Sequence, residues 1–341
     1  MKKAAGSRPG DAPVWLLLGR GAGDNAQIEA LAGAAGAPAR AFRLSHNLLR
    51  EAPNALLGGT LATLRADPGF APPWPALVIG AGRRNAPVGR WIARASGGRA
   101  RLVWIGRPRA PLDWFDLALT TPQYGMAAGV NVMRLSLPFD AGIAPAPGPR
   151  RFLAALGGPS WSASLGPDFI RRFARAAREE AGRAGLPLSL ATSPRTPAGA
   201  GAILRDALGD GAEIHDWRAQ AGAANPYRDW LREAGGVLVS GDSVSLISDA
   251  VGSGAPVAVL APPAPGWIRA LRASGPGRRW LASGGRGFLA PPPDIGAVTA
   301  HLEAQGLARR DGDLIRVEAA LPAIRVEREA AAARVRALLH R

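Results

Sequence analysis

Four small polar residues, Ser240-Gly241-Asp242-Ser243, follow the apolar run Val237–Val239 and precede a segment whose apolar residues have helical spacing. Glycines end that segment, and Pro256–Leu260 is a second apolar run. We expect a βαβ unit whose strands are buried on both faces, as in a parallel sheet covered by helices. With Asp242 or Ser243 as N-cap, the helix would present free N–H groups and its positive dipole end at the sheet edge, an arrangement that binds phosphate. An ordinary capped crossover that binds nothing is the alternative.

Other polar residues in the second half of the chain have the chemistry needed to hold a nucleotide diphosphate without a metal. Two glycines allow close approach of a ligand to the backbone, hydroxyls and one guanidinium can bind phosphate oxygens, and a carboxylate can accept both hydroxyls of a ribose. Arginine and a helix dipole would then stabilise the leaving group. In that order the residues are Gly157, Gly158, Ser193, Thr196, Arg195 and Asp249.

The first half of the chain also places glycine-rich turns directly after apolar runs. Val14–Leu18 leads into Gly19–Asn25, and Ala76–Ile79 leads into Gly80–Asn85. The glycine spacing is not Gly-x-Gly-x-x-Gly, and the Lys-Ser/Thr pair of a P-loop is missing, so neither a dinucleotide site nor an ATPase site is indicated. A tight turn without a ligand is the alternative for the first of these segments.

Three charged residues in these turns are candidates for acceptor chemistry. Asp24 ends the first loop, where it would face a cleft, and is the candidate general base, with an N-cap role as the alternative. Arg83 and Arg84 could hold an anionic acceptor or could simply occupy a turn. No Gly-x-Ser-x-Gly motif stands where a nucleophile elbow belongs. The four histidines, His46, His215, His301 and His340, lack the spacing of a metal pair, so no metal site is expected.

The strand and turn pattern runs through the chain twice, which predicts the class α/β with two Rossmann-like open parallel-sheet domains facing each other across a cleft. A helix is expected at Ala55–Arg65, Phe288–Ala290 and Val298–Leu302 complete the second domain, and Asp311-Gly312-Asp313 is interpreted as a solvated loop. The helix Val317–Leu339 is amphipathic and could cross to the other domain, cap its own or, through its arginines, lie on a membrane. The predicted divisions are a flexible N-terminus (1–12), a first domain (13–140), a linker (141–151), a second domain (152–315) and a C-terminal helix (316–341).

The composition indicates a soluble globular protein that favours anionic partners. The 341 residues include 42 Lys and Arg against 26 Asp and Glu, giving a net charge of +16 that is spread along the chain. Only two basic residues are lysine, as in proteins of GC-rich genomes, and there is no cysteine for a disulfide or a thiolate nucleophile. With no signal peptide and no apolar run of about 18 residues, a cytoplasmic location is expected. The inner face of the membrane is the alternative location.

Two resemblances extend this interpretation. Leu246–Asp249, followed by Gly254-Ala255-Pro256, resembles the donor segment of GT-B glycosyltransferases, notably the lipid-linked N-acetylglucosaminyl transferase of peptidoglycan synthesis. That enzyme holds the nucleotide ribose with an acidic residue, usually glutamate, and Asp249 is the matching position. The chain more closely resembles the plant mitochondrial-fission ("elongated mitochondria") proteins and their bacterial relatives. The motifs are Gly21-Ala22-Gly23 with Asn25-Ala26-Gln27, Gly80–Arg84, Thr192–Pro197, and Asn225-Pro226-Tyr227 with Ser240–Ser245.

The resemblance implies a GT-B-like fold and a metal-independent transferase that moves sugar from a nucleotide diphosphate to an anionic or lipid-linked acceptor, with no separate cofactor. Pro194 replaces a frequent second arginine of the family, which would weaken diphosphate binding, and Ser240 replaces the usual threonine. The alternative is a non-catalytic scaffold or peripheral-membrane protein. A nucleic-acid binder is not expected, because interleaved aromatic residues are missing. The predicted donor-binding residues are Gly157, Gly158, Ser193, Arg195, Thr196, Asn225, Tyr227, Ser240, Gly241, Asp242, Ser243, Ser245 and Asp249, and the predicted acceptor-binding residues are Gly21, Gly23, Asn25, Arg83 and Arg84.

Overall fold

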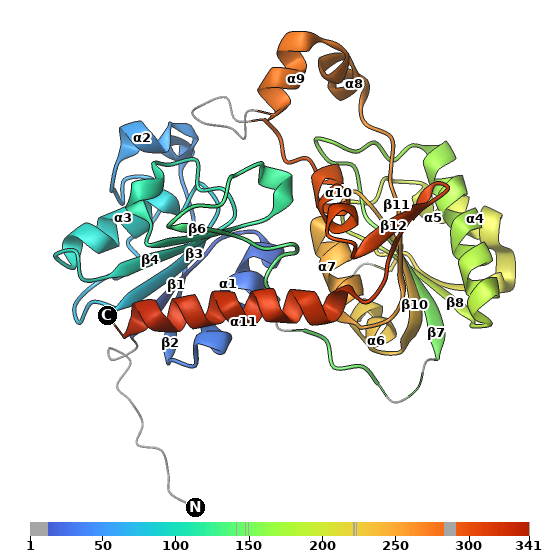
Figure 1. Cartoon of the computed structure of the whole chain (residues 1–341), viewed down its shortest axis with the longest axis horizontal. Coiled ribbons are helices and arrows are strands. Elements are labelled where there is room, and N and C mark those ends of the chain that lie inside the picture. The colour runs from blue at the N-terminus through green and yellow to red at the C-terminus, as the bar shows by residue number, and fades with distance from the viewer. Residues whose placement is uncertain are drawn as a thin grey trace, which may run out of the picture.

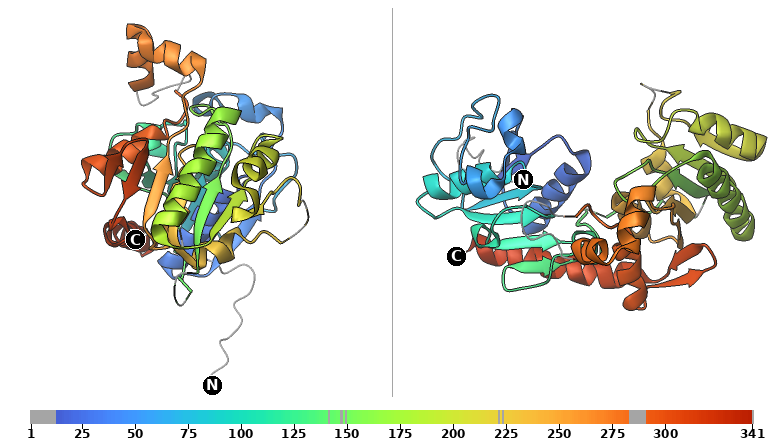
Figure 2. Two further views of the ribbon diagram at one scale, coloured as in Figure 1. Left: turned by 90° about the vertical axis from the view of Figure 1, so that its right-hand side faces the viewer. Right: turned by 90° about the horizontal axis from the view of Figure 1, so that it is seen from above.

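The computed structural model describes residues 13–140, 142–146, 148, 150–220, 222, 224–282 and 291–340. Two α/β domains lie side by side, and the long helix α11 (Ala320–Leu339) runs along both of them (Figure 1). Each domain has its own sheet with helices on both faces (Figure 2). The predicted fold class is therefore confirmed. The predicted N-terminal segment 1–12 lies outside the described residues.

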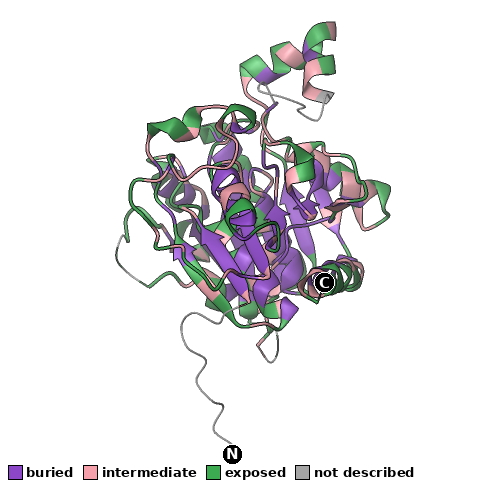
Figure 3. Ribbon diagram, turned by 90° about the vertical axis from the view of Figure 1, so that its left-hand side faces the viewer, coloured by how far each residue is buried: buried purple, intermediate pink, exposed green. Residues whose placement is uncertain are grey.

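The first domain is built on six parallel strands in the order β2-β1-β3-β4-β5-β6. The strand order reverses between β1 and β3, so the turns after these strands open a crevice at the carboxyl edge, where ligands of open α/β sheets bind. The central strands are buried on both faces (Figure 3). The elements are β1 (Val14–Leu18), α1 (Ala22–Ala35), β2 (Ala39–Arg43), η1 (Leu48–Glu51), α2 (Asn54–Leu57), β3 (Leu77–Ala81), α3 (Ala86–Ala95), β4 (Arg101–Ile105), η2 (Leu112–Trp114), β5 (Leu117–Thr120), η3 (Pro122–Tyr124) and β6 (Val132–Arg134).

The second domain has a seven-stranded sheet in the order β12-β13-β11-β10-β7-β8-β9, in which β12 and β13 form an antiparallel edge. Its strand order reverses between β7 and β10, so the turns after these two strands open the second crevice. The elements are β7 (Arg151–Leu156), α4 (Pro167–Ala184), β8 (Leu188–Thr192), α5 (Ala200–Leu208), η4 (Gly209–Gly211), β9 (Ala212–His215), α6 (Tyr227–Arg232), β10 (Ala234–Ser240), α7 (Val244–Gly252), β11 (Val257–Leu260), α8 (Gly266–Ala273), α9 (Gly275–Ala282), α10 (Gly296–Ala304), β12 (Ala308–Asp311) and β13 (Leu314–Val317).

Helix α11 crosses from the second domain to the first, so it does not cap its own domain alone; contact of its arginines with a membrane stays a prediction. Ala320 and Ile324 belong to the core of the second domain, whereas Ala331 and Val335 are fully or almost fully buried in the core of the first. Between these two halves, Arg328 forms an ion pair with Asp140 at 2.6 Å, at the point where the chain passes between domains. The helix therefore joins the two domains mechanically.

One local prediction is wrong, and the structure gives the form of two other segments. The helix expected at Ala55–Arg65 is wrong, because only Asn54–Leu57 is helical and Gly58, with φ of +60°, ends it. Asp311-Gly312-Asp313 is exposed to solvent, as predicted, and forms the turn of the β12–β13 hairpin. Val298–Leu302 lies within helix α10, and Phe288–Ala290 lies outside the described residues.

Candidate functional site

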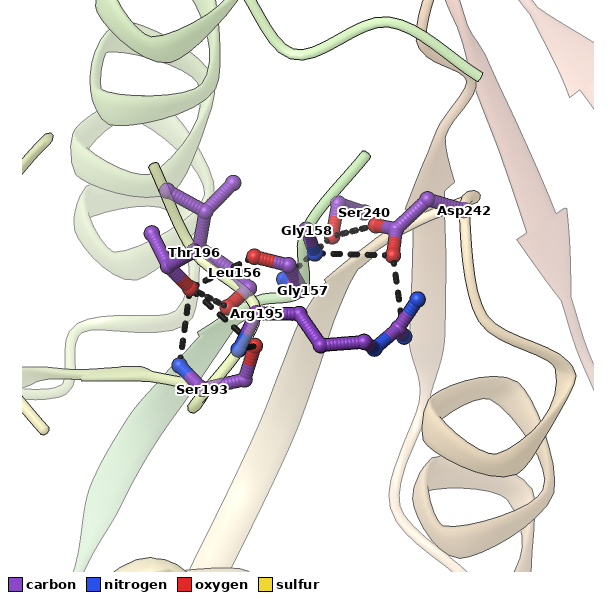
Figure 4. A network of polar contacts seen from close by, with 8 residues as sticks. All are labelled: Leu156, Gly157, Gly158, Ser193, Arg195, Thr196, Ser240 and Asp242. Carbon is purple, nitrogen blue, oxygen red and sulfur yellow. Dashed lines mark hydrogen bonds and ion pairs between the residues drawn. The ribbon is translucent and has the colours of Figure 1, made fainter. Parts of the chain in front are cut away.

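The turns at the strand-order reversal of the second sheet are held together by hydrogen bonds to one buried carboxylate (Figure 4). Asp242 accepts a hydrogen bond from the Gly158 N–H at 2.9 Å and another from the Ser240 hydroxyl at 2.5 Å. Ser240 Oγ in turn accepts from the Gly157 N–H at 2.8 Å, and Arg195 Nη2 lies 3.5 Å from Asp242 Oδ2. We call these five residues the Asp242 network. It joins the ends of β7 and β10 to the loop after β8.

Thr196 fixes the loop after β8 against the end of β7. Its hydroxyl donates toward the carbonyls of Leu156 and Gly157, at 3.0 and 2.5 Å, and accepts from the Ser193 N–H at 2.8 Å. Ser193 Oγ accepts from the N–H of Arg195 at 3.3 Å. The predicted residues Ser193, Arg195 and Thr196 are thus brought together with the Asp242 network, and the loop geometry is set by hydroxyl–backbone bonds.

The two predicted glycines are required by packing between the loops. A Cβ on Gly158 would lie 2.2 Å from the carbonyl oxygen of Arg195, and one on Gly157 would lie 2.2 Å from Asp242 Oδ2. Gly157, Gly158 and Asp242 therefore contact one another and not a ligand. Burial raises the pKa of the Asp242 carboxyl. The Arg195 side chain, 51% exposed, is the part of the network that can reach a ligand.

Helix α7 begins at Val244 without the side-chain cap that the sequence predicted. Ser243 occupies the N-cap position but makes no capping hydrogen bond, and the Asp242 carboxylate points to Gly158 instead. A Cβ on Gly23, in the first turn of α1, would lie 3.5 Å from the Ser245 hydroxyl. The N-termini of α1 and α7 thus meet across the domain boundary. Both helices direct their N–H groups and positive dipole ends to this junction.

Asp249 on α7, Tyr227 at the start of α6 and Asn225 in the turn before α6 form a separate group. The Tyr227 hydroxyl lies 3.3 Å from Asp249 Oδ2, and the Asn225 carboxamide accepts from the Tyr227 N–H at 3.0 Å. Burial raises the pKa of Asp249. No hydrogen bond or ion pair connects this group to the Asp242 network within the described residues, so its role in ribose binding stays a prediction. Gly241 lies between Ser240 and Asp242 in the turn after β10, and its N–H donates to the Leu260 carbonyl at 2.9 Å.

An open cleft of about 1670 Å³ is lined mainly by the first domain and bordered on one side by a few residues of the second. The first domain supplies the turns after β1, β3 and β4, and the second supplies aromatic residues from the loop after β7 and from α8 and α9. Six arginines and two acidic residues line it, so the cleft is strongly positive. These charged residues are Arg20, Arg50, Arg83, Arg84, Arg107, Arg109, Asp24 and Glu51.

Asp24 lines this cleft from the first turn of α1. Its side chain is open to the cleft, but the surrounding walls remove enough water that desolvation raises the pKa of the carboxyl. Asp24 is not the N-cap of α1. Gly21 occupies the N-cap position, and no side chain makes a capping hydrogen bond there. The position next to Gly23 places Asp24 beside the junction of the two helix N-termini, which is compatible with a general base.

The other predicted acceptor residues have distinct surroundings. Asn25 bonds both the N–H and the carbonyl of Gly19, at 2.9 and 3.0 Å, so it holds the first glycine turn in shape. Arg83 forms an ion pair with Glu51, and Arg84 lies 3.5 Å from the same carboxylate. Glu51 thus neutralises part of the charge of these arginines.

Sequence reasoning missed several cleft residues, among them two arginines and two tryptophans. Arg107 and Arg109 follow strand β4, and the tryptophans Trp161 and Trp267 face each other at 6.2 Å between ring centroids. Trp161 is 70% exposed, which is unusual for so large an apolar side chain. The Arg-Pro-Arg sequence directly after an apolar run was the available signal for the arginines. Nothing in the local pattern marks the tryptophans, because they come from distant segments.

Within the described residues, no group of three or more His, Asp or Glu side chains has the arrangement of a metal site. His46 lies in the cleft wall, where its Nε2 is 2.9 Å from the Asn85 carboxamide oxygen and burial lowers its pKa. His301 lies 3.1 Å from the Ser136 hydroxyl, between the domains.

None of the helices in the described ranges is both long and apolar enough to span a bilayer.

The profile of the family described as mitochondrial fission ELM1 matches residues 22–274, about three quarters of the chain. The chain belongs to this family. The match begins in α1 and ends just beyond α8, so it includes the glycine turn of Gly23, the Asp242 network and the start of α7. The family resemblance that the sequence motifs indicated is confirmed. No curated protein matches the sequence.

Three solved structures show distant similarity to this family member. A putative UDP-N-acetylglucosamine 2-epimerase from Listeria monocytogenes has TM-score 0.43 and 12% identity, over 73% of this chain and 79% of that one. The apo lipopolysaccharide outer core galactosyltransferase WaaB has TM-score 0.32 and 9% identity, over 72% and 79%. A structure described as trehalose-6-phosphate from E. coli bound with UDP-2-fluoro glucose has TM-score 0.39 and 13% identity, over 96% of both chains. At such low scores and identities, neither ligand nor activity follows from the similarity.

Proposed function

We propose that this ELM1-family protein is a metal-independent glycosyltransferase of the GT-B type that binds a nucleotide diphosphate sugar between its two domains. The observation that carries the proposal is the meeting of α1 and α7 at the domain boundary, where Gly23 faces the Ser245 hydroxyl. Each helix begins in the crevice at the strand-order reversal of its own sheet. Two helix N-termini directed to one point favour a diphosphate. Arg195 supplies the nearby guanidinium.

In this proposal the donor and acceptor residues act on opposite sides of the junction. Arg195 and the N–H groups at the start of α7 hold the diphosphate, and Asp249 accepts the ribose hydroxyls. Asp24 takes the proton from an acceptor hydroxyl as that oxygen bonds to the anomeric carbon, while the bond from that carbon to the diphosphate breaks. The nucleoside diphosphate leaves with the bonding electrons, and the helix dipoles and Arg195 stabilise its charge.

A thermal-shift screen with nucleoside diphosphates and nucleotide sugars tests the proposal. At least one of them should raise the Tm of the wild-type protein, and the Arg195→Gln and Asp249→Ala variants should lose that increase. Asp168→Asn is the matched control, because Asp168 lies on the exposed surface of α4 and forms only an i,i+3 pair with Arg171. If no nucleotide or nucleotide sugar changes the Tm, the proposal is wrong.

One observation favours the alternative, a non-catalytic scaffold that docks on a membrane or a protein. The Gly158 N–H and the Asp242 carboxylate, two groups able to bind a ligand, already bond to each other. A scaffold should bind liposomes or a partner equally well after Arg195→Gln or Asp249→Ala. A transferase should instead lose nucleotide binding in those variants, so the same two proteins distinguish the alternatives.

A further inference from the structure

Arg107 is a buried cation for which the described residues supply no negative charge. Only 8% of it is exposed, and its guanidinium donates to two carbonyls, Tyr124 O at 3.5 Å and Pro291 O at 2.5 Å. Neither Arg107 nor Arg109 forms an ion pair with a described carboxylate. A charged group removed from water is costly unless a partner of opposite charge balances it. The cleft next to Arg107 is the place from which such a partner can come.

Arg109, whose side chain is exposed to the cleft, adds a second positive charge that no described carboxylate pairs with, and a strained backbone. Its φ is +48°, in the left-handed region that disfavours side chains, and in the described chain it shares this property with one other non-glycine residue, Ala319. Burial lowers the pKa of Arg109, and the charge of Arg83 lowers it further. The pKa of Arg107 is likewise lowered by burial and then by Arg109. Strain and like-charge repulsion that persist in a cleft wall are typical of ligand-binding positions.

The second domain completes the surroundings of these arginines. The Pro291 carbonyl accepts from Arg107, and the Asp294 N–H donates to the Gln123 carbonyl at 2.9 Å. Across the same cleft lie the exposed faces of Trp161 and Trp267. The cleft therefore combines a positive floor with an aromatic wall, which suits an amphipathic molecule that carries an anionic group.

We propose that Arg107 and Arg109 form a phosphate-binding site for the acceptor, separate from the donor diphosphate site at the α1–α7 junction. Guanidinium groups bind phosphate oxygens in bidentate geometry, and the phosphate would replace the missing counter-charge. The rest of the acceptor would lie against Trp161 and Trp267. The assignment rests on the proposed transferase function. The phosphate can belong to a lipid headgroup or to a soluble phosphorylated molecule.

The test compares inorganic phosphate with a nucleoside diphosphate on the full-length protein, by calorimetric titration. Arg109→Gly should weaken phosphate binding about 10- to 100-fold, as expected for the loss of a charged hydrogen-bond partner, and should leave nucleotide affinity unchanged. Arg195→Gln should do the reverse. Arg94→Gln, an exposed arginine on α3, is the charge control, and Arg107→Lys should retain part of the affinity because it keeps the charge without the fork.

A second measurement separates loss of the site from loss of the fold. Arg109→Gly and Ala319→Gly both relieve a positive φ, so both should raise the Tm without ligand, but only Arg109→Gly should lose the further increase caused by phosphate. Unchanged phosphate affinity in Arg109→Gly, or an equal loss in Arg94→Gln, would overturn this proposal while leaving nucleotide binding intact. Failure of nucleotide binding in the wild-type protein would instead refute the transferase function.

Vesicles identify the source of the phosphate. If the acceptor is lipid-linked, the wild-type protein should sediment with phosphatidylcholine vesicles that contain phosphatidic acid and not with pure phosphatidylcholine, and Arg109→Gly should abolish the difference. If it is soluble, free phosphate should bind while both kinds of vesicle leave the protein in solution. Sedimentation with phosphatidic acid vesicles that is unaffected by Arg109→Gly would place the lipid contact elsewhere and contradict the assignment.

Discussion

Gly158→Ala should disrupt the Asp242 network more than any other single-methyl change. The added Cβ would lie 2.2 Å from the Arg195 carbonyl oxygen and 2.4 Å from its carbonyl carbon, so one loop must move by about 1 Å to reach ordinary van der Waals contact. Overpacking of this kind costs about 1–3 kcal/mol. The movement also breaks the bond from the Gly158 N–H to the buried Asp242 carboxylate, which costs about 1.5–3 kcal/mol.

Together these terms destabilise the second domain by about 2.5–6 kcal/mol, or roughly 5–24 °C in Tm for a domain of this size. Differential scanning calorimetry measures the change, and nucleotide titration below the transition measures the effect of displacing Arg195. Gly182→Ala, on α4 with open space around it, is the control and should be stabilising by about 0.5–1 kcal/mol. A Gly158→Ala variant with wild-type Tm and wild-type nucleotide affinity would refute this account of the network.

Three further changes test other parts of the structure. The folded-state pKa of Asp24 is raised above 3.8, so the contribution of this carboxyl to stability is present below pH 3.8 and is lost as the pH rises through the folded value. In thermal melts across pH, Asp24→Asn should therefore be more stable than wild type near pH 7 and equal to it at pH 3. The same variant should lose transferase activity. Val335→Asp should detach α11 from the first domain and cost more than about 3 kcal/mol in denaturant titration, whereas Val326→Asp, on the exposed side of the helix, should cost almost nothing. Arg328→Met should loosen the domain junction, seen as faster proteolysis near Asp140, because it leaves that carboxylate without its ion-pair partner.

The strands and glycine turns could be predicted because they carry strong local signals. Strand β10, for example, contains the run Val237–Val239, which is apolar on both faces, and a parallel sheet covered by helices requires this. Strand β12 gave no such signal, since Ala308–Asp311 is mostly charged and lies at an edge. The helix expected at Ala55–Arg65 failed for a related reason. Its apolar spacing continued past Gly58, but the backbone turned there.

The candidate site was predictable in its positions and less so in its contacts. Turns at the carboxyl ends of parallel strands meet at one edge, so Gly157, Ser240 and Arg195 could be expected to lie together. Asp242 bonds Gly158 instead of capping α7 because of the depth at which its side chain is buried. A sequence pattern does not contain that depth. Arg107 was missed because its importance depends on its neighbours in the folded chain. No carboxylate among the described residues pairs with it, and the sequence does not show this.

The most direct test of the central claim is a crystal structure of the protein grown with a nucleoside diphosphate. The account predicts density for the diphosphate between the first turns of α1 and α7, within hydrogen-bonding distance of Arg195 and beside Gly23 and Ser245. A nucleotide bound on another surface, or a fully occupied nucleotide whose phosphates point away from both helix N-termini, would contradict it.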